Sequence, residues 1–145
     1  MIGKLQPKSA SRTDHIHIAG GTNYSRGGGA TLKAKFGLEK DISDHLNDSY
    51  GDRAPKVAAI ANEGFDARLD ERHPYIEAEV IYGVKEESAR TPVDILCRRT
   101  RLFFLDRNAA LRAVPRVTAL VGEVLGWSSD EQTRQAQEAI LFLQK

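Results

Sequence analysis

Cysteine and long apolar runs are scarce in this sequence of 145 residues. The single cysteine, Cys97, cannot build a disulfide framework, and we expect it to be a buried small hydrophobic residue rather than a nucleophile. No apolar stretch approaches the roughly 20 residues needed to cross a bilayer. The N-terminal residues also lack the apolar core of a signal peptide. The sequence therefore predicts neither a membrane span nor a secreted disulfide scaffold.

An excess of charge of one sign is also missing. The chain has 21 basic and 20 acidic residues, for a formal net charge of +1. Proteins dedicated to nucleic acids usually carry a large basic excess that displaces phosphate counterions, so we expect no nucleic-acid partner. With 41% hydrophobic and 28% charged residues, the chain is typical of one globular domain.

Recognisable cofactor and metal motifs are absent as well. Gly27–Gly29 precede a helical segment, but no P-loop lysine and hydroxyl follow them, and no GxGxxG sequence occurs. His15 and His17 would lie on one side of a strand, yet two ligands without a nearby carboxylate or cysteine make a poor zinc site. His45 and His73 are isolated in the sequence. We therefore expect no metal, no bound cofactor and no catalytic residue in this chain.

Turn and capping residues predict an all-α fold, a compact bundle of about six to eight short helices with an extended N-terminal lead-in. Residues 1–14 are polar and are expected to form a flexible lead-in, followed by a single helical domain at 15–145. Within that domain, the alternating residues 15–21 predict one short strand. Helices are expected to end at Gly37, Gly51, Gly64 and Gly126. Others are expected to begin at Pro74, at Thr91-Pro92, at Asp106 or Asn108, and at Ser129. Gln132 would complete a capping box with Ser129.

Residues 75–106 contain an acidic segment followed by an arginine-rich one, and both are expected to be helical. Four glutamates and one lysine lie between Glu77 and Glu87. A helical projection places Glu77 inside an apolar stripe, whereas Glu79 and Glu86 fall on the opposite side and are expected to be solvated. The apolar stripe consists of Ile76, Val80, Ile81 and Val84.

A helix at residues 92–105 is expected to be central, because its apolar arc covers more than half its circumference. The arc consists of Val93, Ile95, Leu96, Cys97, Leu102, Phe103 and Phe104. Arg99 points into this arc and Thr100 lies at its middle. A charge in a core requires a partner. We therefore predict a buried or half-buried Glu77–Arg99 pair that fixes the register of the two helices.

Arg98 and Arg101 remain on the narrow polar face, together with Asp94, which lies four residues before Arg98 and can pair with it. Guanidinium groups on an exposed face bind carboxylates and phosphates well. An ordinary solvated patch, contact with another domain and contact with an anionic ligand all remain open.

Three segments of the chain resemble a known family. They are DISDHLNDSYGDRA (41–54), PYIEAEVIYGVKEESARTPVDILCRRTRLFFLD (74–106) and VPRVTALVGEVLGWSSDE (114–131). They are similar to the C-terminal helical domain of FAD-dependent glycerol-3-phosphate dehydrogenases and glycerophosphate oxidases, and the likeness covers roughly residues 15–145. The family's proline-containing segment before the first helix is replaced here by SRGGGA.

The resemblance implies that the whole enzyme binds FAD in an N-terminal region, oxidises glycerol 3-phosphate to dihydroxyacetone phosphate and passes electrons to quinone. It implies peripheral attachment to the bacterial cytoplasmic membrane or the mitochondrial inner membrane. This chain would then be an accessory domain, inactive alone, that packs on the flavin and substrate domains through Arg98 and Arg101. The alternative is a free-standing helical module that binds an anionic partner through the same arginines.

Overall fold

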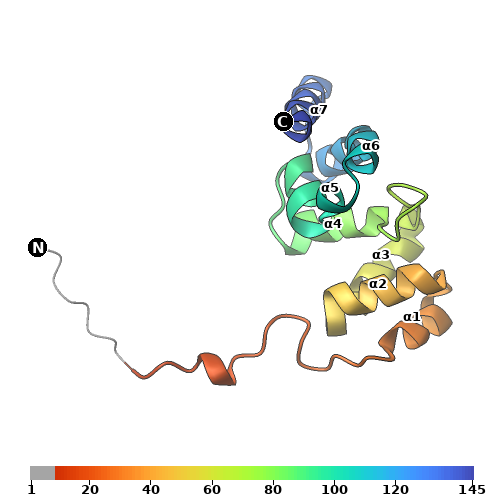
Figure 1. Ribbon diagram of the computed structural model, residues 1–145, viewed down its shortest axis with the longest axis vertical. Helices are drawn as coiled ribbons and strands as arrows, with labels where there is room; N and C mark the ends of the chain where they lie inside the picture. The colour runs from red at the N-terminus through yellow and green to blue at the C-terminus, as the bar shows by residue number, and fades with distance from the viewer. Residues whose placement is uncertain (1–8) are drawn as a thin grey trace, which may run out of the picture.

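The computed structural model describes residues 9–145. Residues 1–8 of the predicted lead-in lie outside the described residues. Residues 9–19 are exposed. Figure 1 shows this segment running out beyond α2 (Lys40–Tyr50), away from the other helices.

The prediction of an all-α fold is confirmed. Residues 9–145 contain seven α-helices, short 3-10 and π-helical turns, and no strand. Besides α2, the helices are α1 (Gly28–Phe36), α3 (Ala54–Ile60), α4 (Glu77–Glu86), α5 (Leu102–Leu105), α6 (Arg107–Leu125) and α7 (Ser129–Gln144). Helices α1 and α2 lie at one end of the molecule and α7 at the other, with α4 and α5 between them (Figure 1).

The first three helices pack around a small apolar core of their own. Its anchors on α2 are Ile42 and Leu46, both buried. Gly29 allows α1 to approach α2 closely, since a Cβ atom there would lie 3.0 Å from the Asp44 Cα. Gly37 ends α1 in the left-handed conformation (φ 72°), as predicted for a helix C-cap.

Helix α4 separates two apolar cores and is buried on both sides. Ile76, Ala78 and Tyr82 face the core shared with α1–α3, whereas Val80 and Ile81 face the core shared with α6 and α7. Every residue from 77 to 84 is buried as a result. The central helix of the fold is therefore α4, and not the predicted helix at 92–105.

The C-terminal core is closed by α6 and α7, which begin at side-chain caps. Asp106 accepts a hydrogen bond from the Ala109 amide (2.8 Å), which confirms the first of the two predicted starts. Ser128 accepts one from the Glu131 amide (3.2 Å), so the cap of α7 lies one residue before the predicted Ser129. The chain offers two adjacent serines, and the acidic residue three positions after Ser128 favours the earlier one.

The predicted strand at residues 15–21 is wrong. Thr13–His15 form a single 3-10 turn, and the Gly21 amide closes a second turn on the Ile18 carbonyl (3.0 Å). A strand needs a neighbour to satisfy its backbone, and within residues 9–145 only the Gly20 carbonyl of this segment meets one, the Asp52 amide (2.9 Å).

The predicted helix at residues 92–105 is broken into two parts. A π-helical segment, η4 (Asp94–Arg99), precedes α5, and the Thr100 amide bonds the Ile95 carbonyl five residues back (2.9 Å). Arg101 then adopts the left-handed conformation with φ 60°. Both features rotate the side chains away from the positions expected for a regular α-helix.

Candidate interdomain surface

Arg98 is exposed but already paired. It forms an ion pair with Asp94, one turn earlier, as the spacing indicated. Asp94 also accepts the amides of Arg90 and Thr91, each at 3.0 Å. Burial raises the pKa of Asp94, yet these hydrogen bonds outweigh it and hold the pKa below its ordinary value. Arg98 therefore neutralises a local carboxylate, which leaves less of its charge for a partner.

Arg101 is different, because within residues 9–145 it forms no ion pair. Its side chain is exposed. Burial, followed by the charge of Glu79, raises the pKa of the nearby Tyr75, and the charge of Arg101 opposes this only in part. A left-handed non-glycine residue costs roughly 1–2 kcal/mol. The helix break at Thr100 also separates Arg98 from Arg101, so the two do not share one regular helix face.

Two large apolar side chains follow Arg101 on α5 and are exposed. Phe104 is 67% exposed and Leu105 is 68% exposed. The prediction that Phe104 belongs to the buried arc is wrong, because the break at Arg101 turns α5 relative to η4. We call Arg101, Phe104 and Leu105 the α5 face. Within residues 9–145, it combines an arginine that forms no ion pair with two exposed apolar side chains.

The predicted Glu77–Arg99 pair is wrong in its partner. Glu77 is buried, as expected, but it receives two hydrogen bonds of 2.6 Å from Arg116 on α6. Arg99 instead pairs with Glu87 (3.1 Å) and donates to the Glu87 carbonyl (2.6 Å). The π-helical turn of η4 advances by less than the about 100° per residue of an α-helix. Arg99 consequently lies at the edge of the core.

Thr100 is buried, and its hydroxyl donates to the Ile95 carbonyl (3.1 Å). The same carbonyl also accepts the Thr100 amide, so Thr100 bonds it through both its backbone and its side chain. Cys97 is buried as predicted, and burial raises the pKa of its thiol. A raised thiol pKa disfavours the nucleophilic thiolate.

Arg116→Ala tests the corrected pairing. It leaves Glu77 buried without its partner, and we expect a loss of about 1–2 kcal/mol, below the range for fully buried pairs because Arg116 is half-exposed. Arg99→Ala is the matched control and should cost less than about 1 kcal/mol. Urea unfolding followed by circular dichroism measures both. A larger loss for Arg99→Ala would restore the original pairing.

Glu79 was predicted to be solvated, and this prediction is wrong. The residue is 1% exposed because α4 is covered on both sides. One carboxylate oxygen accepts the Ile76 amide (2.9 Å) at the start of α4. The other lies 2.9 Å from His45 Nε2 and 3.0 Å from the Tyr50 hydroxyl, which donates to it. Glu79 therefore joins the N-terminus of α4 to two side chains of α2.

The aromatic residues around Glu79 complete a buried polar cluster. Burial, followed by the charge of Glu79, raises the pKa of Tyr50 far above its ordinary value. Tyr50 meets Tyr82 edge to face, with ring centroids 5.4 Å apart. The hydroxyl of Tyr82 is buried and has no hydrogen-bond partner among residues 9–145. Sequence spacing gave no sign of this cluster, because the residues of α2 that bond Glu79 lie 29 and 34 positions before it.

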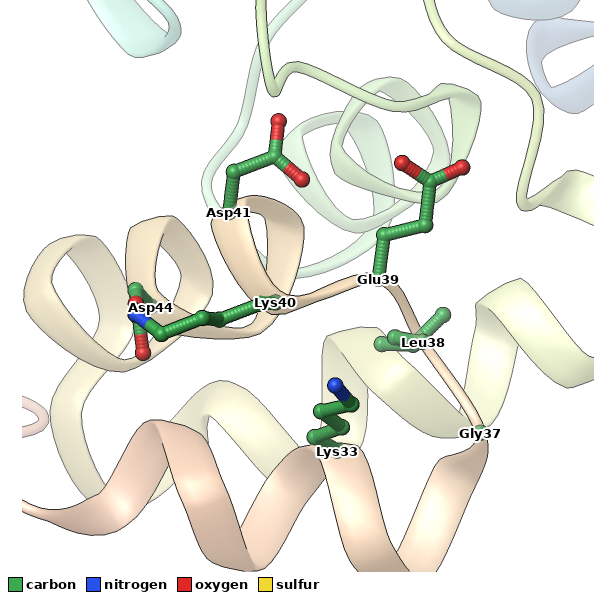
Figure 2. A pocket seen from close by; sticks show the side chains of 7 residues that line it. All are labelled: Lys33, Gly37, Leu38, Glu39, Lys40, Asp41 and Asp44. Atoms are coloured by element: carbon green, nitrogen blue, oxygen red, sulfur yellow. Dashed lines mark hydrogen bonds and ion pairs between the residues drawn. The ribbon is translucent and has the colours of Figure 1, made fainter.

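A hollow of about 640 Å³ lies between α1 and α2 (Figure 2). Four of its charged groups, from Glu39 to Asp44, are paired with neighbours, and Lys33 also lines it. Lys40 pairs with Asp44 (2.6 Å), while Glu39 and Asp41 both accept hydrogen bonds from Arg68. Figure 2 shows Lys40 extended along α2 toward Asp44, and Glu39 and Asp41 directed away from Lys33. No reactive pair of side chains converges in this hollow.

Metal-binding geometry is not found in the described part of the chain. No group of three or more His, Cys, Asp or Glu residues in residues 9–145 could hold a metal ion. His15 and His17 are exposed. His45 and His73 contact the carboxylates of Glu79 and Asp106 instead.

The family is shown by comparison with known sequences. A model of the C-terminal domain of alpha-glycerophosphate oxidase matches residues 11–132. The probable mitochondrial glycerol-3-phosphate dehydrogenase of Dictyostelium discoideum is 43% identical over 132 residues, covering 90% of this chain and 21% of the relative. The mitochondrial glycerol-3-phosphate dehydrogenase of Homo sapiens is 40% identical over 139 residues, covering 92% of this chain and 19% of the relative.

The fold and the matched residues define an all-α C-terminal domain. The chain belongs to the family of the C-terminal domain of alpha-glycerophosphate oxidase, as the sequence resemblance predicted. It spans about a fifth of the length of the curated relatives that it matches. In residues 9–145, no helix combines the length and apolar character that a bilayer crossing requires.

Proposed function

We propose that this chain is the C-terminal accessory domain of an FAD-dependent glycerol-3-phosphate dehydrogenase and docks on the flavin and substrate domains through the α5 face. The observation that carries the proposal is the combination of Arg101, Phe104 and Leu105. An isolated domain gains nothing by exposing two neighbouring large apolar residues, whereas such residues mark protein interfaces when they lie together. Arginine and aromatic residues are also the side chains that anchor interfaces most often.

The whole enzyme would remove a hydride from carbon 2 of glycerol 3-phosphate and release dihydroxyacetone phosphate. FAD, bound in the other domains, would accept the hydride and pass the electrons to quinone. In this proposal the present chain supplies neither cofactor ligands nor catalytic groups. Its residues Arg98 and Arg101 contact the neighbouring domain, with Arg101 as the stronger contact because Arg98 is paired with Asp94.

We propose a mitochondrial location for the whole enzyme, peripheral on the inner membrane. This rests on the relatives, whose names place them in mitochondria. The rival function, a free-standing module that binds an anionic partner, has less support. That function depends on the charges of Arg98 and Arg101, and Asp94 already pairs with Arg98.

A graft tests the proposal. The matching region of the Dictyostelium discoideum relative is replaced by residues 11–145 of this chain, and bound flavin and glycerol-3-phosphate-dependent dye reduction are measured. We expect the graft to retain both, and the relative lacking that region, like the isolated chain, to reduce no dye. Turnover by the isolated 145-residue chain would contradict the proposal. A graft that contains a folded helical domain but lacks flavin and activity would also contradict it.

A further inference from the structure

The segment Ile16–Ile18 precedes the helices and exposes two large apolar side chains. Ile16 is 66% exposed and Ile18 is 81% exposed. The backbone of Ile16 is extended (φ −100°, ψ 110°). Side chains alternate sides along an extended chain, so continuing this conformation would put both isoleucines on one side and His17 on the other. Within residues 9–145, the amides of His17 and Ile18 form no hydrogen bond.

This segment is fixed at its C-terminal end by a close contact between two glycines. The Asp52 amide donates to the Gly20 carbonyl (2.9 Å), and the Asn23 amide donates to the Asp52 carboxylate (3.1 Å). A Cβ atom on Gly51 would lie 2.0 Å from the Gly20 oxygen, and one on Gly20 would lie 2.5 Å from the Tyr50 oxygen. The segment therefore leaves the junction of α2 and α3 at a defined point.

The surface beside the segment is also uncovered. A hollow of about 380 Å³ is lined by Ile18, Tyr24 and Tyr50 together with the Gly20 backbone. Tyr24 is 47% exposed and is held by a hydrogen bond from its hydroxyl to Asp48 (3.3 Å). The hollow thus extends from Ile18 to the end of α2, where Asp48 and Ser49 add polar groups to its lining.

We propose that Ile16–Ile18 pairs as an edge strand with an open β-sheet edge in the part of the longer protein that precedes this domain. The inference rests on the proposed function. The matched family is a C-terminal domain, and the chain spans about a fifth of its relatives, so the preceding part is the larger one. Ile16–Ile18 lies where that part joins the helical domain.

The chemistry of the segment favours this partner over others. An extended chain binds a sheet edge through main-chain hydrogen bonds. The amides of His17 and Ile18 are available for this, whereas the Ile18 carbonyl already accepts the Gly21 amide. Isoleucine is among the residues preferred in strands. The isoleucine side chains are uncharged and offer no group for an anionic ligand. The hollow beside Ile18 could be covered when the segment pairs with a sheet.

Hydrogen exchange of the backbone amides tests the pairing. It is measured for His17 and Ile18 in the isolated chain and in the graft described above. We expect rapid exchange in the isolated chain and exchange slowed by about a hundredfold in the graft, because pairing protects amides that opening must expose. His17→Pro, which removes a donor, should abolish protection at Ile18 in the graft. Ser11→Pro, in the exposed lead-in, is the matched control and should leave protection unchanged.

The outcomes separate this inference from the proposed function. An active, flavin-containing graft whose His17 and Ile18 amides exchange as fast as in the isolated chain overturns the strand and leaves the accessory-domain function intact. A graft without flavin and turnover overturns both. Protection in the isolated chain that appears only when light scattering detects a dimer assigns the segment to a second copy and also overturns the proposal.

Discussion

Glu79→Ala is expected to destabilise the isolated domain by about 3–5 kcal/mol, because several hydrogen-bonding groups lose their acceptor at once. The carboxylate is 1% exposed and contacts the Ile76 amide, His45 and the Tyr50 hydroxyl. Its removal leaves buried donors without acceptors, and each such group costs about 1–3 kcal/mol. Since small domains are stable by only about 5–15 kcal/mol, the variant should lie close to unfolding.

Two further variants give the control for this experiment. Glu79→Gln keeps one acceptor oxygen and should fall between Glu79→Ala and the unchanged chain. Glu86→Ala removes an exposed carboxylate from the same helix and should change stability by no more than about 0.5 kcal/mol. Urea unfolding followed by circular dichroism measures all three. Equal losses for Glu79→Ala and Glu86→Ala would show that Glu79 is solvated, as the helical projection indicated.

Substitutions on the α5 face are expected to lower the turnover of the graft strongly. Arg101→Glu combined with Phe104→Ser reverses the charge of Arg101 and removes one of the two exposed apolar side chains. Interface anchors each cost 2 kcal/mol or more when truncated, so we expect turnover of the graft to fall by at least about tenfold. Both residues are exposed, so the isolated domain should keep its helical content and its unfolding midpoint.

The helical fold was predictable because most helix ends are set by local sequence. Three helices end at a glycine with positive φ: Gly37, Gly51 and Gly126. One helix begins at the side-chain cap Asp106. These positions need φ > 0 or a side-chain cap, which few residue types supply. Local rules therefore recovered the helical class and most helix ends.

The pairings were not predictable by the same reasoning. The projection treated residues 92–105 as one regular helix, whereas η4 and the left-handed Arg101 change the rotation along the segment. It also assumed that α4 has one buried side, but α4 packs between two cores. Arg116 and His45, which meet Glu77 and Glu79, come from distant helices. No spacing rule connects residues across such distances.

Turnover of the graft carrying Arg101→Glu and Phe104→Ser tests the central claim most directly. Lys56→Glu is the matched control, since Lys56 is exposed on α3 and its substitution makes the same change in charge. We expect the double variant to lose at least about tenfold in glycerol-3-phosphate-dependent dye reduction, and Lys56→Glu to retain the activity of the graft. Undiminished turnover by the double variant would contradict docking through the α5 face.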